Sequence, residues 1–181
     1  EPPCDVGYRN FRVSFHGVAV TGHRRRDHDV VRVAGPYGTF HASSSSREMV
    51  MLAGGVGIAP IRSIVVDQLS SGSKRRISLW YGVRDARDLQ YAEEFDRLAA
   101  QHPNFQWHAV YSSAHNERAR TGFVGLIHNV VYTEFLEQNA GLDDMEFYIC
   151  GPPLMSAAVL EMLDDLGIER ENVYLDDFGG G

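Results

Sequence analysis

The sequence predicts an α/β fold, a doubly wound parallel sheet of five strands in the order 3-2-1-4-5. Two observations support this prediction. From Met49 onward, apolar runs typical of buried strands alternate with helical patterns. At two strand-to-helix junctions the chain carries clusters of glycine and proline, which are Gly54 to Pro60 and Cys150 to Pro153.

The elements follow one another with short connections. Strands are expected at 49–53, 77–82, 105–111, 146–149 and 173–175. Helices are expected at 59–69, 88–100, 125–139 and 153–166. Gly72 and Gly167 stand where glycine commonly ends a helix, and Pro103 closes the second helix.

The two glycine clusters are suited to binding phosphate groups. Without Cβ atoms, the backbone can turn sharply and approach a pyrophosphate, while the next helix offers free N–H groups. Right-handed crossovers with one reversal of strand order place the first and fourth strands side by side. We therefore expect both clusters to face a single crevice that binds a nucleotide.

The composition excludes several other classes of function. The net charge of −7 and the pI near 5.6 disfavour binding to nucleic acid or to an anionic membrane surface. No apolar stretch approaches the ~20 residues that cross a bilayer, and the start resembles no signal peptide. We therefore expect no direct membrane insertion by this chain. With only Cys4 and Cys150 present, we expect the protein to be located in the reducing cytoplasm.

Other polar clusters are expected to be structural. The eight histidines show no ligand spacing, so no metal site is predicted. Glu93, Glu94 and Asp96 are expected on an exposed helical face, complemented by Arg97 three residues after Glu94.

Upstream of Met49 the pattern differs in kind. Residues 29–33 alternate like a strand, residues 35–38 form a turn, and Ser43 to Ser46 are interpreted as a linker. A further strand is possible at 11–15, and the rest of 1–28 shows no clear period. We divide the chain into segments 1–42 and 43–181.

These motifs resemble the ferredoxin–NADP reductase superfamily, from Gly35-Pro36-Tyr37-Gly38 through both clusters to the end. Within it, the chain is similar to the F subunits of sodium-translocating NADH:quinone oxidoreductases. The strings that carry this narrower resemblance are Trp80 to Arg84, Tyr91 to Phe95, Pro103 to Phe105, Ile127 to Val130 and Leu175 to Gly180.

The resemblance implies a fold, a reaction and a partner set. Residues 1–42 would be a partial or divergent remnant of a β-barrel flavin domain, and 43–181 the NAD-binding reductase domain. NADH would pass hydride to FAD, and electrons would continue through a [2Fe–2S] centre to quinone. Because the flavin motif and a cysteine-rich domain are missing, FAD-barrel and iron–sulfur domains and membrane quinone-reductase subunits are expected as partners, at the cytoplasmic face of a bacterial inner membrane.

The resemblance also assigns roles to residues. Cys150 would lie near the reacting carbon without acting as a nucleophile, and Phe178 would cover the flavin ring as a gate. A side chain at Gly57 would clash with the pyrophosphate. The full set of expected cofactor-binding residues is Gly54, Gly55, Val56, Gly57, Ile58, Ala59, Pro60, Gly82, Arg84, Ser112, Glu117, Cys150, Gly151, Pro152, Pro153, Met155, Asp177 and Phe178.

The choice of nucleotide depends on the residues after the third strand. Relatives that use NADPH place an arginine beside a serine there, because guanidinium pairs with the 2′-phosphate. Here no arginine adjoins Ser112 and Ser113, and Glu117 would repel a phosphate. This favours NADH, although Arg84, Arg118 and Arg120 lie near in sequence.

Two alternatives remain open. The chain could belong to an NAD(P)H reductase component that feeds an oxygenase, with the same hydride step and another acceptor. It could also be a dinucleotide-binding module without turnover of its own.

Overall fold

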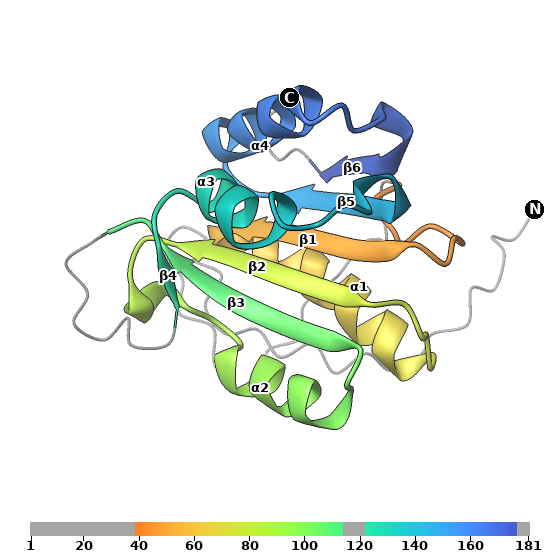
Figure 1. The fold of residues 1–181 in the computed structure, drawn as a ribbon. Coiled ribbons are helices and arrows are strands. Elements are labelled where there is room, and N and C mark those ends of the chain that lie inside the picture. The colour runs from red at the N-terminus through yellow and green to blue at the C-terminus, as the bar shows by residue number, and fades with distance from the viewer. Residues whose placement is uncertain (1–38, 114–121, 177–181) are drawn as a thin grey trace, which may run out of the picture. The chain divides into compact units, whose positions relative to one another are not determined.

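The computed structural model describes residues 39–113 and 122–176. In this part of the chain the strands form one six-stranded sheet in the order β4-β3-β2-β1-β5-β6, and every strand pair is parallel (Figure 1). The strands are β1 Glu48–Gly54, β2 Ile77–Val83, β3 Phe105–Tyr111, β4 Phe123–Val124, β5 Met145–Cys150 and β6 Val173–Asp176.

The predicted topology is confirmed. The five expected strands are β1, β2, β3, β5 and β6, and they occur in the predicted order. The reversal of order lies between β1 and β5, which pair from Glu48↔Met145 to Ala53↔Cys150.

In the described ranges, two helices cover each face of the sheet (Figure 1). The helices are α1 Ile58–Ser70, α2 Ala92–Gln101, α3 Ile127–Val131, which continues as a π-helical segment Tyr132–Leu136, and α4 Pro153–Asp165. Along β1, Met49, Met51 and Ala53 lie in the core under α1 and α2, while Val50 and Leu52 lie under α3 and α4. A parallel sheet covered on both faces explains why its strands are continuous apolar runs.

The helix ends agree with the sequence for the first and last helices. Gly72 and Gly167 follow α1 and α4 with φ of +78° and +74°. This left-handed conformation is easy only for glycine, and it directs the chain away from each helix.

Two element predictions are wrong in part. The sheet has a sixth strand, β4, whose two residues are too few to produce a pattern in the sequence. The second helix begins at Ala92 rather than Asp88. Asp85 caps a short 3-10 turn by accepting from the Arg87 amide, and the chain is extended again at Leu89.

The expected pairing of Glu94 with Arg97 is not found. Glu94 instead binds Arg62 of α1 through two charge-assisted hydrogen bonds of 2.7 and 2.6 Å. Arg97 donates to the backbone carbonyl of Glu93. The acidic face of α2 therefore contacts α1 rather than only solvent.

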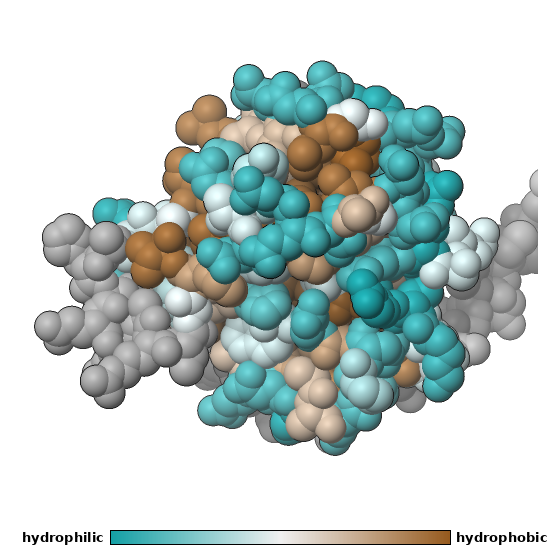
Figure 2. Space-filling model, viewed as in Figure 1, coloured by the Kyte–Doolittle hydropathy of each residue, from teal (hydrophilic) through white to brown (hydrophobic). Residues whose placement is uncertain are grey.

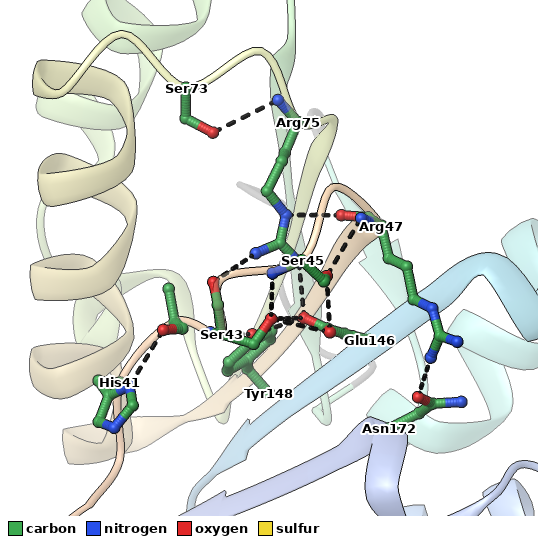
Figure 3. A network of polar contacts seen from close by, with 10 residues as sticks. His41, Ser43, Ser45, Arg47, Ser73, Arg75, Glu146, Tyr148 and Asn172 are labelled. Atoms are coloured by element: carbon green, nitrogen blue, oxygen red, sulfur yellow. Dashed lines mark hydrogen bonds and ion pairs between the residues drawn. The ribbon is translucent and has the colours of Figure 1, made fainter.

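The serine run 43–46 is a structured segment and not a linker. Ser43 and Ser45 both donate to the carboxylate of Glu146 on β5, at 2.7 to 2.8 Å (Figure 3). Arg75 binds the same carboxylate at 2.6 Å and is itself buried. The local sequence did not indicate this structure, because Glu146, the hydrogen-bond partner of both serines, lies 101 to 103 residues away along the chain.

Several predictions lie outside the described residues. They concern the strands expected near 11–15 and 29–33, the turn at 35–38 and the barrel remnant. The division at residue 42 stays a prediction. In the described ranges, no helix is both long enough and apolar enough to cross a membrane.

Candidate functional site

The two glycine turns meet at the carboxyl edge of the sheet. Since Ala53 of β1 pairs with Cys150 of β5, the chain leaves both strands at the same level. A Cβ built on Gly151 would lie 3.1 Å from the Gly54 amide nitrogen. The expected single crevice is therefore present, and its two walls touch at their base.

A cavity of about 860 Å³ opens beside these turns. Eight of the residues predicted to bind the cofactor line it, namely Gly54, Gly55, Val56, Gly82, Arg84, Ser112, Pro152 and Met155. The volume is that of a typical small-molecule site.

Other predicted residues lie beneath the cavity and support it. Gly57, Ile58, Cys150 and Gly151 are buried and do not line it. A Cβ on Gly57 would lie 2.1 Å from the carbonyl oxygen of Cys150, so this glycine allows the first turn to pack on β5. The expectation that a Gly57 side chain would meet the pyrophosphate is corrected, because that direction is filled by the protein backbone.

Three further predicted residues that the structure describes do not line the cavity. Ala59, Pro60 and Pro153 belong to the first turns of α1 and α4 but are absent from the lining. Glu117, Asp177 and Phe178 lie outside the described residues.

Gly55 is the glycine that opens toward the cavity. Its φ is +52°, and an added Cβ would meet no atom within 4 Å. The hydroxyl of Tyr81 on β2 donates to the Gly55 carbonyl at 3.4 Å. Burial raises the pKa of Tyr81, while a hydrogen bond from the Gln90 backbone lowers it in part. Tyr81 thus connects two loops that both line the cavity.

Cys150 is held as a neutral thiol. Its side chain is fully buried at the end of β5, and its Sγ lies 4.0 Å from a carboxylate oxygen of Asp176. Burial, together with the nearby Asp176 charge, raises the pKa of this thiol to about 12. Since the thiolate is the nucleophilic form, this arrangement fits an orienting role rather than covalent catalysis.

One side of the cavity carries charges of both signs. Arg84, Arg87 and Asp88 line it, and all three follow β2. Arg87 is paired with Asp85 at 3.0 Å. Sequence reasoning missed Arg87 and Asp88 because it placed the start of a helix there. The signal available was their position just after a parallel strand, where ligands commonly bind.

The other side is apolar. Val56 lies within the first glycine turn and Leu154 follows the second, and both line the cavity with exposed fractions of 77% and 88%. Leu126, from the connection that precedes α3, adds a third exposed apolar side chain. Figure 2 shows apolar surface along the edge where the carboxyl ends of the strands lie in Figure 1.

Metal ligands are not gathered at this site. Within residues 39–113 and 122–176, no three side chains of His, Cys, Asp or Glu are placed to hold a metal ion.

Solved structures share this fold. The Amycolatopsis cytochrome P450 reductase GcoB matches with a TM-score of 0.68 and 27% identity, over 80% of this chain and 42% of that one. A ferredoxin NADP+ reductase from Neisseria gonorrhoeae, solved with bound FAD and NADP, matches with a TM-score of 0.62 and 23% identity, over 74% and 56%. The second likeness concerns the fold alone.

Curated relatives are closer in sequence. The F subunit of the Na(+)-translocating NADH-quinone reductase of Pseudomonas aeruginosa strain UCBPP-PA14 is 52% identical over 153 residues. Its counterpart in Haemophilus influenzae strain 86-028NP is 50% identical. Each alignment covers 84% of this chain, which spans only 38% and 37% of those relatives.

The family comparison covers the site itself. The model of the oxidoreductase NAD-binding domain matches residues 51–161, which contain both glycine turns. The chain belongs to the oxidoreductase NAD-binding domain family, with the ferredoxin reductase-like fold and the close similarity to NADH-quinone reductase F subunits that its motifs predicted.

Proposed function

We propose that this chain is the NADH-binding module of a flavin-dependent reductase, and that it presents the nicotinamide of NADH to FAD. The observation that carries the proposal is the single cavity bordered by two glycine turns from neighbouring parallel strands. In that position a dinucleotide can lie across the crevice with its pyrophosphate at one turn and its nicotinamide at the other.

The first turn is suited to the pyrophosphate. Gly55 leaves the backbone open on the cavity side, and α1 begins three residues later with its positive dipole end near the turn. Gly57 lets the turn pack closely on Cys150. The turn and the start of α1 thereby offer backbone N–H groups to an anion.

The second turn is suited to the nicotinamide. Pro152 of this turn lines the cavity, and Cys150 just before it is a buried thiol. The neutral thiol does not compete as a nucleophile, and Leu154 adds apolar surface to the cavity beside this turn. FAD, when bound, accepts the hydride and can release its electrons singly.

The charges favour NADH over NADPH. Arg84, Arg87 and Asp88 all line the cavity, but Arg87 is paired with Asp85, so we base the preference on the carboxylate of Asp88. A carboxylate there repels a 2′-phosphate and accepts a hydrogen bond from a ribose hydroxyl. This extends the argument made from Glu117 to a residue that the structure describes.

The onward path is proposed from the relatives. Since they belong to a sodium-translocating NADH-quinone reductase, electrons would leave FAD through a [2Fe–2S] centre toward quinone. The flavin-barrel and iron–sulfur domains and the membrane subunits would be partners at the cytoplasmic face of a bacterial inner membrane. Transfer to an oxygenase is the second candidate, favoured by the 27% identity with a cytochrome P450 reductase.

Titration tests the nucleotide assignment. The purified chain is titrated with NADH, NADPH and ADP-ribose, and we expect NADH to bind about fivefold more tightly than NADPH because of one like-charge contact. Asp88→Asn should narrow that ratio, whereas Asp165→Asn, at the far end of α4, should leave it unchanged. Tighter binding of NADPH would overturn the assignment.

An activity measurement then shows whether the isolated chain only binds NADH or also catalyses its oxidation. Ferricyanide reduction by NADH is followed with and without added FAD. Turnover that depends on FAD supports a flavin-dependent reductase. NADH binding without any turnover would reduce the isolated chain to a binding module, and supplying the flavin-bearing partner domain would then restore the reaction.

A further inference from the structure

Met155 occupies an unusual position between the two glycine turns. It lies in the first turn of α4, and its Sδ would be only 2.4 Å from a Cβ built on Gly54. On the other side, its Cε and Sδ would lie 2.5 and 3.0 Å from a Cβ built on Gly151. The thioether is therefore packed directly against both glycines and joins the two walls of the crevice.

The Met155 side chain also forms part of the cavity wall. Met155 is only partly buried and lines the nucleotide cavity. Three other methionines, Met49, Met51 and Met145, are buried in the core with exposed fractions of 0%, 0% and 3%. Met162 is partly buried too, but it borders a separate groove between α3 and α4. Met155 and Met162 are thus the two methionines of the chain that are not fully buried, and they lie at different places, which offers an internal comparison.

We propose that Met155 is a site of modification by hydrogen peroxide, and that its conversion to the sulfoxide weakens nucleotide binding. The sulfur attacks one peroxide oxygen as the O–O bond breaks. It gives up two electrons to form the S–O bond, and the second oxygen leaves as water with the two peroxide hydrogens. The inference rests on the proposed binding of NADH in this cavity.

The geometry explains why one oxygen atom matters here. The sulfoxide oxygen cannot point toward Gly54 or Gly151, since the sulfur already fills the space on those sides. It must project into the cavity, among apolar neighbours such as Leu154 and Ala158, or displace the side chain from the two turns. A sulfoxide is polar and bulky, so either outcome costs binding free energy.

Bound nucleotide should protect the sulfur in return. NADH lying across the turns covers the cavity side of Met155, which is its accessible side. The rate of oxidation at Met155 should fall at saturating NADH, while the rate at Met162 should not change. Protection is expected because bound nucleotide would block the approach of peroxide to the side chain from the cavity.

The experiment compares treated and untreated protein within each variant. Wild type, Met155→Leu and Met162→Leu are exposed to hydrogen peroxide, and oxidised peptides are quantified by mass spectrometry. The dissociation constant for NADH is then measured by titration. In wild type and Met162→Leu, peroxide should raise the dissociation constant for NADH about tenfold, which corresponds to the free-energy cost of one poorly placed polar group. In Met155→Leu, peroxide should leave it unchanged.

Each outcome decides the matter. Reversal of the effect by methionine sulfoxide reductases supports the proposal. Oxidised Met155 with unchanged affinity overturns it, as does equal loss of affinity in Met155→Leu or resistance of Met155 to peroxide. If the untreated chain binds no NADH, the proposed function itself is wrong. If the untreated chain binds NADH and peroxide does not change the affinity, only the inference about Met155 is wrong.

Discussion

Tyr81 is a residue that connects two loops lining the cavity. Its ring is fully buried in β2, its hydroxyl donates to the Gly55 carbonyl, and the nearby Gln90 backbone partly offsets the rise in its pKa that burial causes. Gly55 and Gln90 both line the cavity. A single oxygen atom therefore fixes the position of two loops that belong to different strand ends.

We expect Tyr81→Phe to weaken NADH binding about threefold to tenfold while the fold is retained. The phenyl ring keeps the packing, but the loops lose their shared partner and the Gln90 amide loses its acceptor. Titration with NADH measures the effect. Tyr111→Phe is the matched control, since Tyr111 is also a buried tyrosine on the neighbouring strand. Equal affinities for Tyr81→Phe and wild type would contradict the connecting role.

At the scale of the element, the first glycine turn separates two tasks that its sequence does not distinguish. Gly55 supplies a left-handed backbone and faces open space. Gly57 has ordinary helical φ and ψ, and its missing side chain makes room for the carbonyl of Cys150. Gly55 permits the left-handed backbone conformation of the turn, whereas Gly57 permits the turn to pack on the end of β5.

This difference predicts two distinct mutant phenotypes. Gly55→Ala should cost about 1 kcal/mol of stability through backbone strain, because its Cβ meets nothing. Gly57→Ala should cost about 3 kcal/mol or prevent folding, since its Cβ would force the turn away from the Cys150 carbonyl. Urea unfolding of both variants provides the comparison. The reverse order of stabilities would show that the turn does not pack on Cys150 as described.

The second helix illustrates a limit of pattern reasoning at this scale. Its apolar periodicity is real, but a left-handed Tyr91 with φ of +60° marks its start. Tyr91 lies under the guanidinium of Arg62, which also binds Glu94. These contacts come from α1, so no local pattern in residues 85–95 could place the boundary.

For the whole molecule, a buried carboxylate joins segments that are distant in sequence. Glu146 on β5 accepts hydrogen bonds from Ser43, Ser45, Tyr148 and Arg75 (Figure 3). Burial raises its pKa, but the four hydrogen bonds lower it more, so the pKa lies below its ordinary value of 4.5. The carboxylate thus fixes the path by which the chain enters the sheet.

This network predicts a specific dependence of stability on pH. Because the folded pKa of Glu146 is lowered, its stabilising effect is present above the ordinary value of 4.5 and is lost as pH falls below it. Glu146→Gln should lower the free energy of unfolding by about 3 kcal/mol at neutral pH. It should also show a weaker loss of stability on acidification.

Urea unfolding between neutral pH and about pH 3 measures both effects. Glu161→Gln, which removes an exposed carboxylate from α4, serves as the control and should follow wild type. If Glu146→Gln and wild type lose stability in parallel on acidification, the network does not hold Glu146 ionised in the folded protein.

The sequence by itself determined the alternating elements, the order of the five main strands and the two glycine turns. It could do so because strand and helix periods, glycine and proline are local signals, and parallel crossovers have one hand. Its family resemblance was confirmed by relatives and solved structures.

Only the tertiary structure decided which residues surround the cavity and which support it from below. It showed that Gly55 and Gly57 have different roles and that the serine run binds Glu146. It also placed Asp88 and Leu154 in the cavity lining. The reason is physical. Burial, partners and pKa shifts depend on atoms brought together from distant segments, and no local pattern encodes which segments those are.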